Sequence, residues 1–204
     1  MIEHDLDKML FSIPSYRHSY DEIAYALENH REIRFVSFVG IDIGGHDTDE
    51  KIPAELFIKD MDKFLTTGVQ TDGSSVVLPK IAKLNNAKVD IIPDLSVNWY
   101  VDYNFGNIDC RTGKPIGTLR IPSYLIHNDT YRVGSRVMLQ EAVLFFKEKL
   151  MQVLRENPYI FDHLPIENAD EIDEIIVTSA TELEFWVKTP EDNADNYQDR
   201  KSVV

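Results

Sequence analysis

The sequence predicts an α+β protein on three observations. The chain has 204 residues, 43% of them hydrophobic, which is enough to bury a core unaided. Short stretches rich in β-branched and aromatic residues, typical of strands, occupy much of residues 33–126. Apolar residues recur at helical spacing in one segment inside this range and in a longer segment at residues 135–156.

The first predicted elements are a helix and a hairpin. Ser19-Tyr20-Asp21-Glu22 has the pattern of a capping box, and apolar residues follow at helical spacing to about Asn29. Residues 33–41 are expected to form a strand because β-branched and aromatic residues are dense there. Gly44-Gly45 then marks a turn, and residues 50–52 begin the return strand.

A helix is predicted next, followed by more strands. Pro53 suits a first helical position, an apolar face follows, and Gly68 stands where a C-terminal cap belongs. Residues 70–75 are small or polar and are expected to form a loop. Further strands are predicted at residues 89–92, 97–103 and 116–126.

A domain boundary is predicted near residues 127–134, where the chain becomes polar and helix-breaking. The longest helical pattern follows, with eight apolar residues at three- and four-residue intervals between Ser135 and Glu156. Residues 175–178 and 182–187 are then expected to form strands.

Composition excludes several classes of function. Asp and Glu total 35 against 21 Lys and Arg, and the net charge of −14 would repel nucleic acid and anionic membranes. Cys110 is the single cysteine, so no internal disulfide can form, and the six histidines have no cysteine partners for a structural zinc site. The acidic N-terminus is not a secretory signal, and no stretch of about 18 apolar residues exists. We therefore expect a soluble cytoplasmic protein.

Glu182 and Glu184 are candidate metal ligands. Residues two apart share one face of a strand, so the two carboxylates would point the same way and repel each other unless a cation lay between them. Mg²⁺ and Mn²⁺ take oxygen ligands of this kind. The alternative is a strand with one solvated face, on which alternating glutamates are common.

The loop Thr71-Asp72-Gly73-Ser74-Ser75 is a second candidate site. An ionised Asp72 beside a glycine could present its carboxylate and backbone N–H groups to a closely approaching ligand. The alternative is an ordinary turn, because Asp, Gly and Ser are common turn residues.

Taken together, in this order and about 110 residues apart, these segments resemble the glutamine synthetase family. That family carries an Asp-Gly-Ser-Ser loop, matched here by residues 72–75, and a metal-binding Glu-x-Glu strand, matched by Glu182-x-Glu184-Phe185. Lys51-Ile52-Pro53-Ala54 and Asp90-Ile91-Ile92-Pro93-Asp94 add to the likeness, which covers roughly residues 20–190. The chain departs from many members at Leu183 and Val77, where they have Pro and Gly, which indicates a divergent branch.

The resemblance implies a fold and a set of domains. Residues 1–18 would be an N-terminal extension, 19–127 a β-grasp domain, and 128–198 the beginning of a glutamine-synthetase-like α/β catalytic domain. Family enzymes are far longer, so we expect the sequence to be the N-terminal portion of a longer protein. Residues 199–204 are expected to be a non-native tail, with a natural C-terminus as the alternative.

The resemblance also implies a reaction. The intact protein would ligate ammonia to L-glutamate through a γ-glutamyl phosphate, with ATP as a substrate and Mg²⁺ or Mn²⁺ as cofactor. Glu184 would bind the metal nearer glutamate and Glu182 the metal nearer ATP. Asp72 would hold and deprotonate ammonium, with Ser75 supporting the loop, at a site shared with the next subunit of a homo-oligomeric ring, expected to be a dodecamer. Two alternatives stay open: a γ-glutamyl ligase for a larger amine, and a non-enzymatic assembly module.

Overall fold

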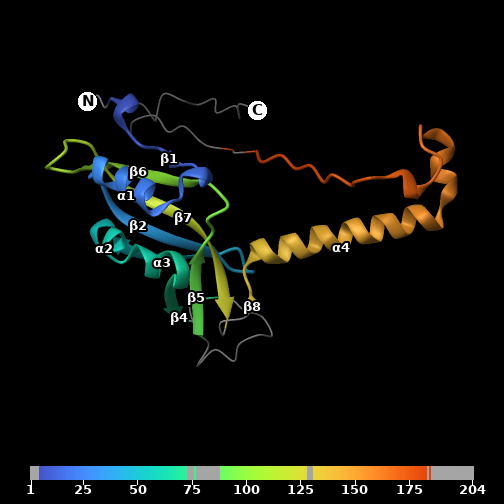
Figure 1. The fold of residues 1–204 in the computed structure, drawn as a ribbon, viewed down its shortest axis with the longest axis horizontal. Helices are drawn as coiled ribbons and strands as arrows, with labels where there is room; N and C mark the ends of the chain where they lie inside the picture. The colour runs from blue at the N-terminus through green and yellow to red at the C-terminus, as the bar shows by residue number, and fades with distance from the viewer. Residues whose placement is uncertain (1–4, 73–75, 77–87, 128–130, 183, 185–204) are drawn as a thin grey trace, which may run out of the picture. The chain divides into compact units, whose positions relative to one another are not determined.

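The computed structural model describes residues 5–72, 76, 88–127, 131–182 and 184. Most strands lie in the first part of the chain, and the longest helix follows them (Figure 1). The elements, in chain order, are η1 (Leu6–Lys8), β1 (Ser12–Ile13), η2 (Ser15–Arg17), α1 (Tyr20–Asn29), β2 (Ile33–Ile41), β3 (Asp47–Pro53), α2 (Ala54–Lys59), α3 (Met61–Thr67), β4 (Val69–Asp72), β5 (Lys88–Pro93), β6 (Trp99–Ile108), β7 (Pro115–His127), β8 (Tyr131–Arg132), α4 (Ser135–Glu156), η4 (Pro158–His163) and η5 (Ala169–Glu171).

The chain forms two compact units, Met1–Lys149 and Leu150–Val204. The boundary between them falls within helix α4. The predicted α+β class is confirmed, because one unit combines a sheet with helices. The predicted boundary at residues 127–134 stays a prediction. Among the helices that the structure describes, none is both long and apolar enough to cross a membrane.

Strand β7 organises the mixed sheet of the first unit. Its first part pairs with β6 on one side and, in parallel, with β2 on the other, giving the order β1-β6-β7-β2-β3. Its last part pairs antiparallel with β5 and β8, and β5 in turn pairs with β4. A single long strand therefore pairs with four others, and β4, which ends at Asp72, joins the sheet through β5.

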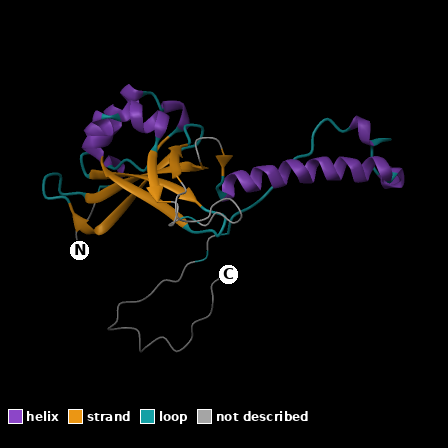
Figure 2. Cartoon of the chain, turned by 90° about the horizontal axis from the view of Figure 1, so that it is seen from below, coloured by secondary structure: helices purple, strands orange, loops and turns teal. Residues whose placement is uncertain are grey.

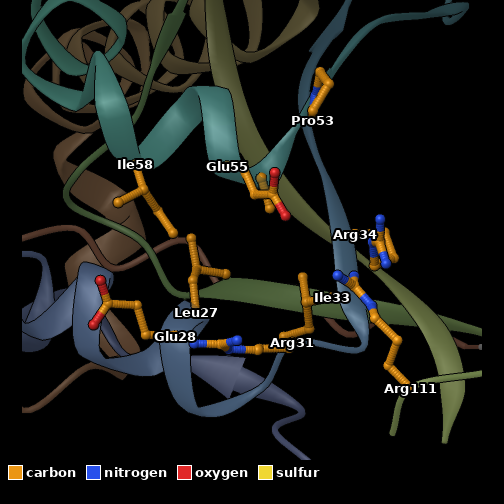
Figure 3. A pocket seen from close by; sticks show the side chains of 10 residues that line it. Leu27, Glu28, Arg31, Ile33, Arg34, Pro53, Glu55, Ile58 and Arg111 are labelled. Carbon is orange, nitrogen blue, oxygen red and sulfur yellow. The ribbon is translucent and has the colours of Figure 1, made fainter. Parts of the chain in front are cut away.

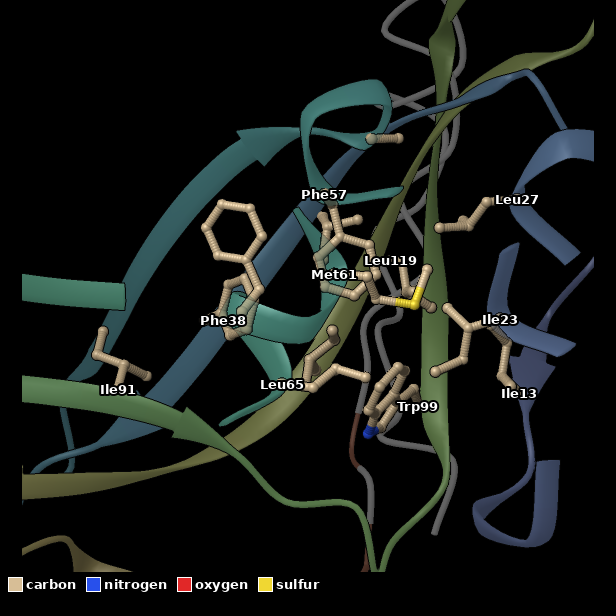
Figure 4. Packing of buried hydrophobic residues seen from close by; sticks show 14 of the residues in the cluster. Ile13, Ile23, Leu27, Phe38, Phe57, Met61, Leu65, Ile91, Trp99 and Leu119 are labelled. Carbon is tan, nitrogen blue, oxygen red and sulfur yellow. The ribbon is translucent and has the colours of Figure 1, made fainter. Parts of the chain in front are cut away.

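Helices α1, α2 and α3 cover one face of this sheet (Figure 2). Phe57 on α2 and Phe64 on α3 pack on Phe38 of β2, with ring centroids 6.0 Å apart in each pair. Trp99 of β6 is fully buried, and Figure 4 shows it beside the aliphatic residues of the same cluster. Burial of these large side chains is the main stabilising contribution to the first unit.

Local sequence signals explain where the helices begin and end. The capping box is confirmed, since the Glu22 N–H donates to Ser19 Oγ at 3.4 Å and the Ser19 hydroxyl donates to Glu22 Oε2 at 2.8 Å. The helix predicted after Pro53 forms as two short helices that meet at Asp60. Gly68 ends the second helix, and its N–H donates to the Phe64 carbonyl.

Two predicted segments differ in the structure. Residues 70–72 belong to strand β4 although they lie at the start of the predicted loop. Residues 175–178, 182 and 184 lie in irregular chain where strands were predicted. The physical reason is the same in both cases, because a strand needs a neighbouring backbone to bond with. β5 supplies that backbone for β4, whereas the ladders of the described residues reach no further than β8.

Candidate functional site

Asp72 lies at the C-terminal end of β4, with its side chain exposed. The turn from α3 into this strand requires Gly68, which has φ +66° and whose missing Cβ would overlap the carbonyl oxygen of Ile91. Thr71 on one side and Val76 on the other are buried. The fold thus fixes the chain on both sides of the predicted loop and presents the Asp72 carboxylate to solvent. Ser75 lies outside the described residues.

The strands that carry Asp72 place three further polar residues around it. Asp72 is paired with Lys88 and Gln70 with Asp90, and residues two apart share a face of the ladder. The Lys88 ammonium lies 3.0 Å from the Asp90 carboxylate. Asp72 therefore lies on a mixed-charge face, where a lysine is its direct cross-strand neighbour.

A shallow pocket of about 580 Å³ adjoins this face. Helix α3 forms one wall through residues that include Lys63 and Thr67, and strands β4 and β5 form the other through Gln70, Lys88 and Asp90. The pocket is lined by both polar and apolar groups, and Asp72 itself is not among them.

Glu182 and Glu184 lie in the second unit, and both are exposed. The two are not on a strand, so the shared face expected for residues two apart does not follow from the backbone here. Within the part of the chain that the structure describes, no group of three or more His, Cys, Asp or Glu residues is placed to hold a metal ion. Asp72 belongs to the first unit.

An ion pair that the sequence did not predict joins buried Asp94, just after β5, to the partly exposed Arg136 in the first turn of α4. The Asp94 side chain is 4% exposed, and it accepts hydrogen bonds from Arg136 and from the backbone and hydroxyl of Ser96. These bonds outweigh the effect of burial and lower the pKa of Asp94 to about 2. Arg136 also stacks over the Tyr124 ring at 4.7 Å. The pair joins α4 to the sheet, and its 42-residue separation leaves no local signal in the sequence.

No protein-family model and no curated protein sequence matches the chain. Solved structures do show similarity. A GmaS complex with ADP shares 14% sequence identity and a TM-score of 0.35 with this chain, and the match covers 52% of this chain and 21% of GmaS. GmaS without ligand shares 14% identity and a TM-score of 0.34, and the match covers 53% of this chain and 21% of GmaS. Glutamine synthetase from Plasmodium falciparum shares 16% identity and a TM-score of 0.44, and the match covers 64% of this chain and 23% of the synthetase.

The chain thus spans about a fifth of the length of the proteins that it matches. Over roughly half of its residues or slightly more, it has a partial structural similarity to glutamine synthetase and GmaS, at low sequence identity.

Proposed function

We propose that the protein containing this chain is an ATP-dependent ligase of the glutamine synthetase type. It would transfer the terminal phosphoryl group of ATP to the side-chain carboxylate of glutamate, and ammonia would then displace phosphate to give glutamine. In this proposal the chain contributes the ammonium-binding loop through Asp72, supported by Ser75, and metal ligands through Glu182 and Glu184.

The observation that carries the proposal is the placement of Asp72. The ladder and the buried residues on both sides fix the backbone, while the carboxylate stays exposed at the end of β4. An exposed carboxylate can attract an ammonium cation and accept its proton, which must leave before nitrogen can attack the acyl phosphate. Lys88 lies directly across the ladder from Asp72 and keeps this face of mixed charge.

The metal part of the proposal is supported only by donor chemistry. Two carboxylates suit a hard divalent cation such as Mg²⁺ or Mn²⁺. The described residues do not complete a site around them, since no third acidic, His or Cys ligand is gathered there. The roles of Glu182 and Glu184 therefore await a direct test, and no step of the reaction is derived through a metal.

Fold and assembly belong to the same proposal. We assign residues 19–127 to a β-grasp domain, supported by the β2–β3 hairpin and by the helices on one face of the sheet. We also propose a homo-oligomeric ring in the cytoplasm, in which Asp72 of one subunit completes the site of the next.

The reaction can be tested with the whole protein, glutamate, ATP, Mg²⁺ and ammonium, by measuring glutamine and released phosphate. Asp72→Ala should lower glutamine formation about 10²-fold or more, because proton transfer from ammonium is lost, while ATP binding and folding persist. Asp102→Ala is the matched control, since Asp102 is an exposed aspartate on β6. Loss of activity in both variants, or in neither, would refute the role of Asp72.

Amine choice and subunit sharing need separate measurements. Replacing ammonium by methylamine distinguishes a ligase for ammonia from a γ-glutamyl ligase for a larger amine. The second kind of enzyme would react faster with methylamine than with ammonium. Co-expression of Asp72→Ala subunits with Glu184→Gln subunits should restore part of the activity if each site uses both chains. Mixed rings that assemble normally and stay as inactive as their parents would rule out a shared site.

A further inference from the structure

A second pocket, of about 360 Å³, lies in the first unit, and none of its lining residues belongs to β4 (Figure 3 shows the lining). Its volume falls within the range of small-molecule sites, about 300–1,000 Å³. The end of α1, the start of β2, helix α2 and the turn between β6 and β7 form its walls. Its lining contains three of the chain's nine arginines, Arg31, Arg34 and Arg111, in a protein of net charge −14.

Arg34 and Arg111 form the cationic wall, and their guanidinium groups lie side by side in Figure 3. Buried Asp109 holds both: Arg34 Nη1 donates to Asp109 Oδ2 at 3.0 Å, and Arg111 Nε lies 3.8 Å from Asp109 Oδ1. Asp109 Oδ1 also accepts the backbone N–H of Arg111 at 2.9 Å. One carboxylate thus positions two guanidinium groups, which keep further N–H donors for a ligand.

The opposite wall has different chemistry. Figure 3 shows Glu55 of α2 directed into the space between Ile58 and Arg34. Leu27 and Ile33 are at most 3% exposed and, with Ile58, form an apolar surface beside Glu55. Glu28 and Arg31 add one charge of each sign to the lining near Leu27 (Figure 3). The pocket therefore offers the Arg34 and Arg111 guanidinium groups, the Glu55 carboxylate and an apolar surface next to them.

We propose that this pocket binds a free α-amino acid with an apolar side chain. The carboxylate would bind Arg34 and Arg111, the ammonium group would face Glu55, and the side chain would pack on the apolar surface. A simple anion would meet the repulsion of the Glu55 carboxylate, and a simple cation that of the guanidinium pair. Only a zwitterion satisfies both walls. The site is independent of the proposed ligase reaction, because its occupancy is measured by binding.

L-leucine, titrated to about 10 mM into the 204-residue chain, is the direct probe. Saturable NMR shifts should occur at the methyl groups of Leu27, Ile33 and Ile58. Two analogues each remove one charge: 4-methylpentanoate lacks the ammonium group, and 3-methylbutylamine lacks the carboxylate. Each analogue should bind at least about tenfold more weakly than leucine, since a charge-assisted contact is lost.

Variants test the two walls separately. Arg111→Gln and Glu55→Gln should each weaken leucine binding about tenfold or more. Arg111 suits the test because its side chain is 51% exposed and its backbone N–H can still bond to Asp109. Arg17→Gln and Glu141→Gln remove charges of the same kind outside the pocket and should leave binding unchanged.

Three results would overturn the proposal. The first is the absence of methyl shifts at the highest leucine concentration. The second is equal binding of leucine and 4-methylpentanoate, which would make the pocket a plain anion site. The third is equal loss of binding in the pocket variants and in their controls.

Discussion

Replacing Asp94 by Asn tests the ion pair that joins α4 to the sheet. The substitution keeps a side-chain oxygen that can accept from Ser96 but removes the charge that pairs with Arg136. It also keeps the backbone oxygen of residue 94, which accepts the Trp99 indole N–H at 3.0 Å. The loss in stability should therefore report the ionised carboxylate, through its charge-assisted bonds to Ser96 and its pairing with Arg136.

The pKa of Asp94 sets the size and pH dependence of the effect. A carboxyl whose pKa falls from 3.8 to about 2 on folding contributes about 2 kcal/mol at neutral pH. Because the folded pKa is the lower one, this stabilisation is complete above the unfolded pKa and disappears as pH falls through the folded pKa. About half of it should remain at pH 3.

Urea unfolding measures this contribution as the difference between wild type and Asp94→Asn at pH 7, 5, 4 and 3. Trp99 fluorescence reports the first unit when the other tryptophan, Trp186, is replaced by Phe in both proteins. We expect a difference of about 2 kcal/mol at pH 7 that narrows to about 1 kcal/mol at pH 3. The exposed-site control Asp102→Asn should change stability by less than about 0.5 kcal/mol.

Two results would contradict this reasoning. A negligible difference at pH 7 would mean that desolvation cancels the attraction of the pair. A difference that stays constant from pH 7 to pH 3 would mean that the lost stability comes from packing and not from the ionised Asp94.

Three further changes have clear expected outcomes. Gly68→Ala should destabilise the first unit by about 3 kcal/mol in urea unfolding, because alanine is strained at φ +66° and its Cβ would overlap the backbone of β5. Gly45 also has a positive φ but has open space around it, so Gly45→Ala should lower the free energy of unfolding by less. Lys114→Met should lower the free energy of unfolding, measured in urea at pH 7, by about 3 kcal/mol. The Lys114 ammonium lies 2.9 Å from Glu32, which is 1% exposed and would lose its main cationic partner. Glu184→Gln should weaken Mn²⁺ binding by the whole protein, measured by calorimetry, because an amide is a poorer ligand than a carboxylate. The control Glu191→Gln should leave the Mn²⁺ affinity unchanged. Equal affinities in the wild type and Glu184→Gln would contradict the metal assignment.

Local sequence determined the elements whose bonds lie within a few residues. The Ser19 capping box begins α1, Gly68 ends α3, and helix α4 runs from Ser135 to Glu156 as its apolar spacing predicts. The hairpin of β2 and β3 also follows from short-range composition. In each case the signal and the bond that it encodes are neighbours in the chain.

For the candidate site, the sequence alone supplied the residue types. It indicated Asp72, Ser75, Glu182 and Glu184 as candidates, but it did not predict the backbone structure around them. The tertiary structure makes Gln70 to Asp72 part of a strand and leaves residues 182 and 184 in irregular chain. Asp has weak strand preference and Gln is no strong strand former, so pairing with β5 decides the first case.

Only the tertiary structure decided which charges meet. Asp94 and Arg136 are 42 residues apart, and Arg34 and Asp109 are 75 apart. The amino-acid pocket likewise gathers residues from Leu27 to Arg111, and no local pattern marks them as one site. Such contacts depend on strand order and on the packing of helices against the sheet, so their partners can be identified only once the chain has folded.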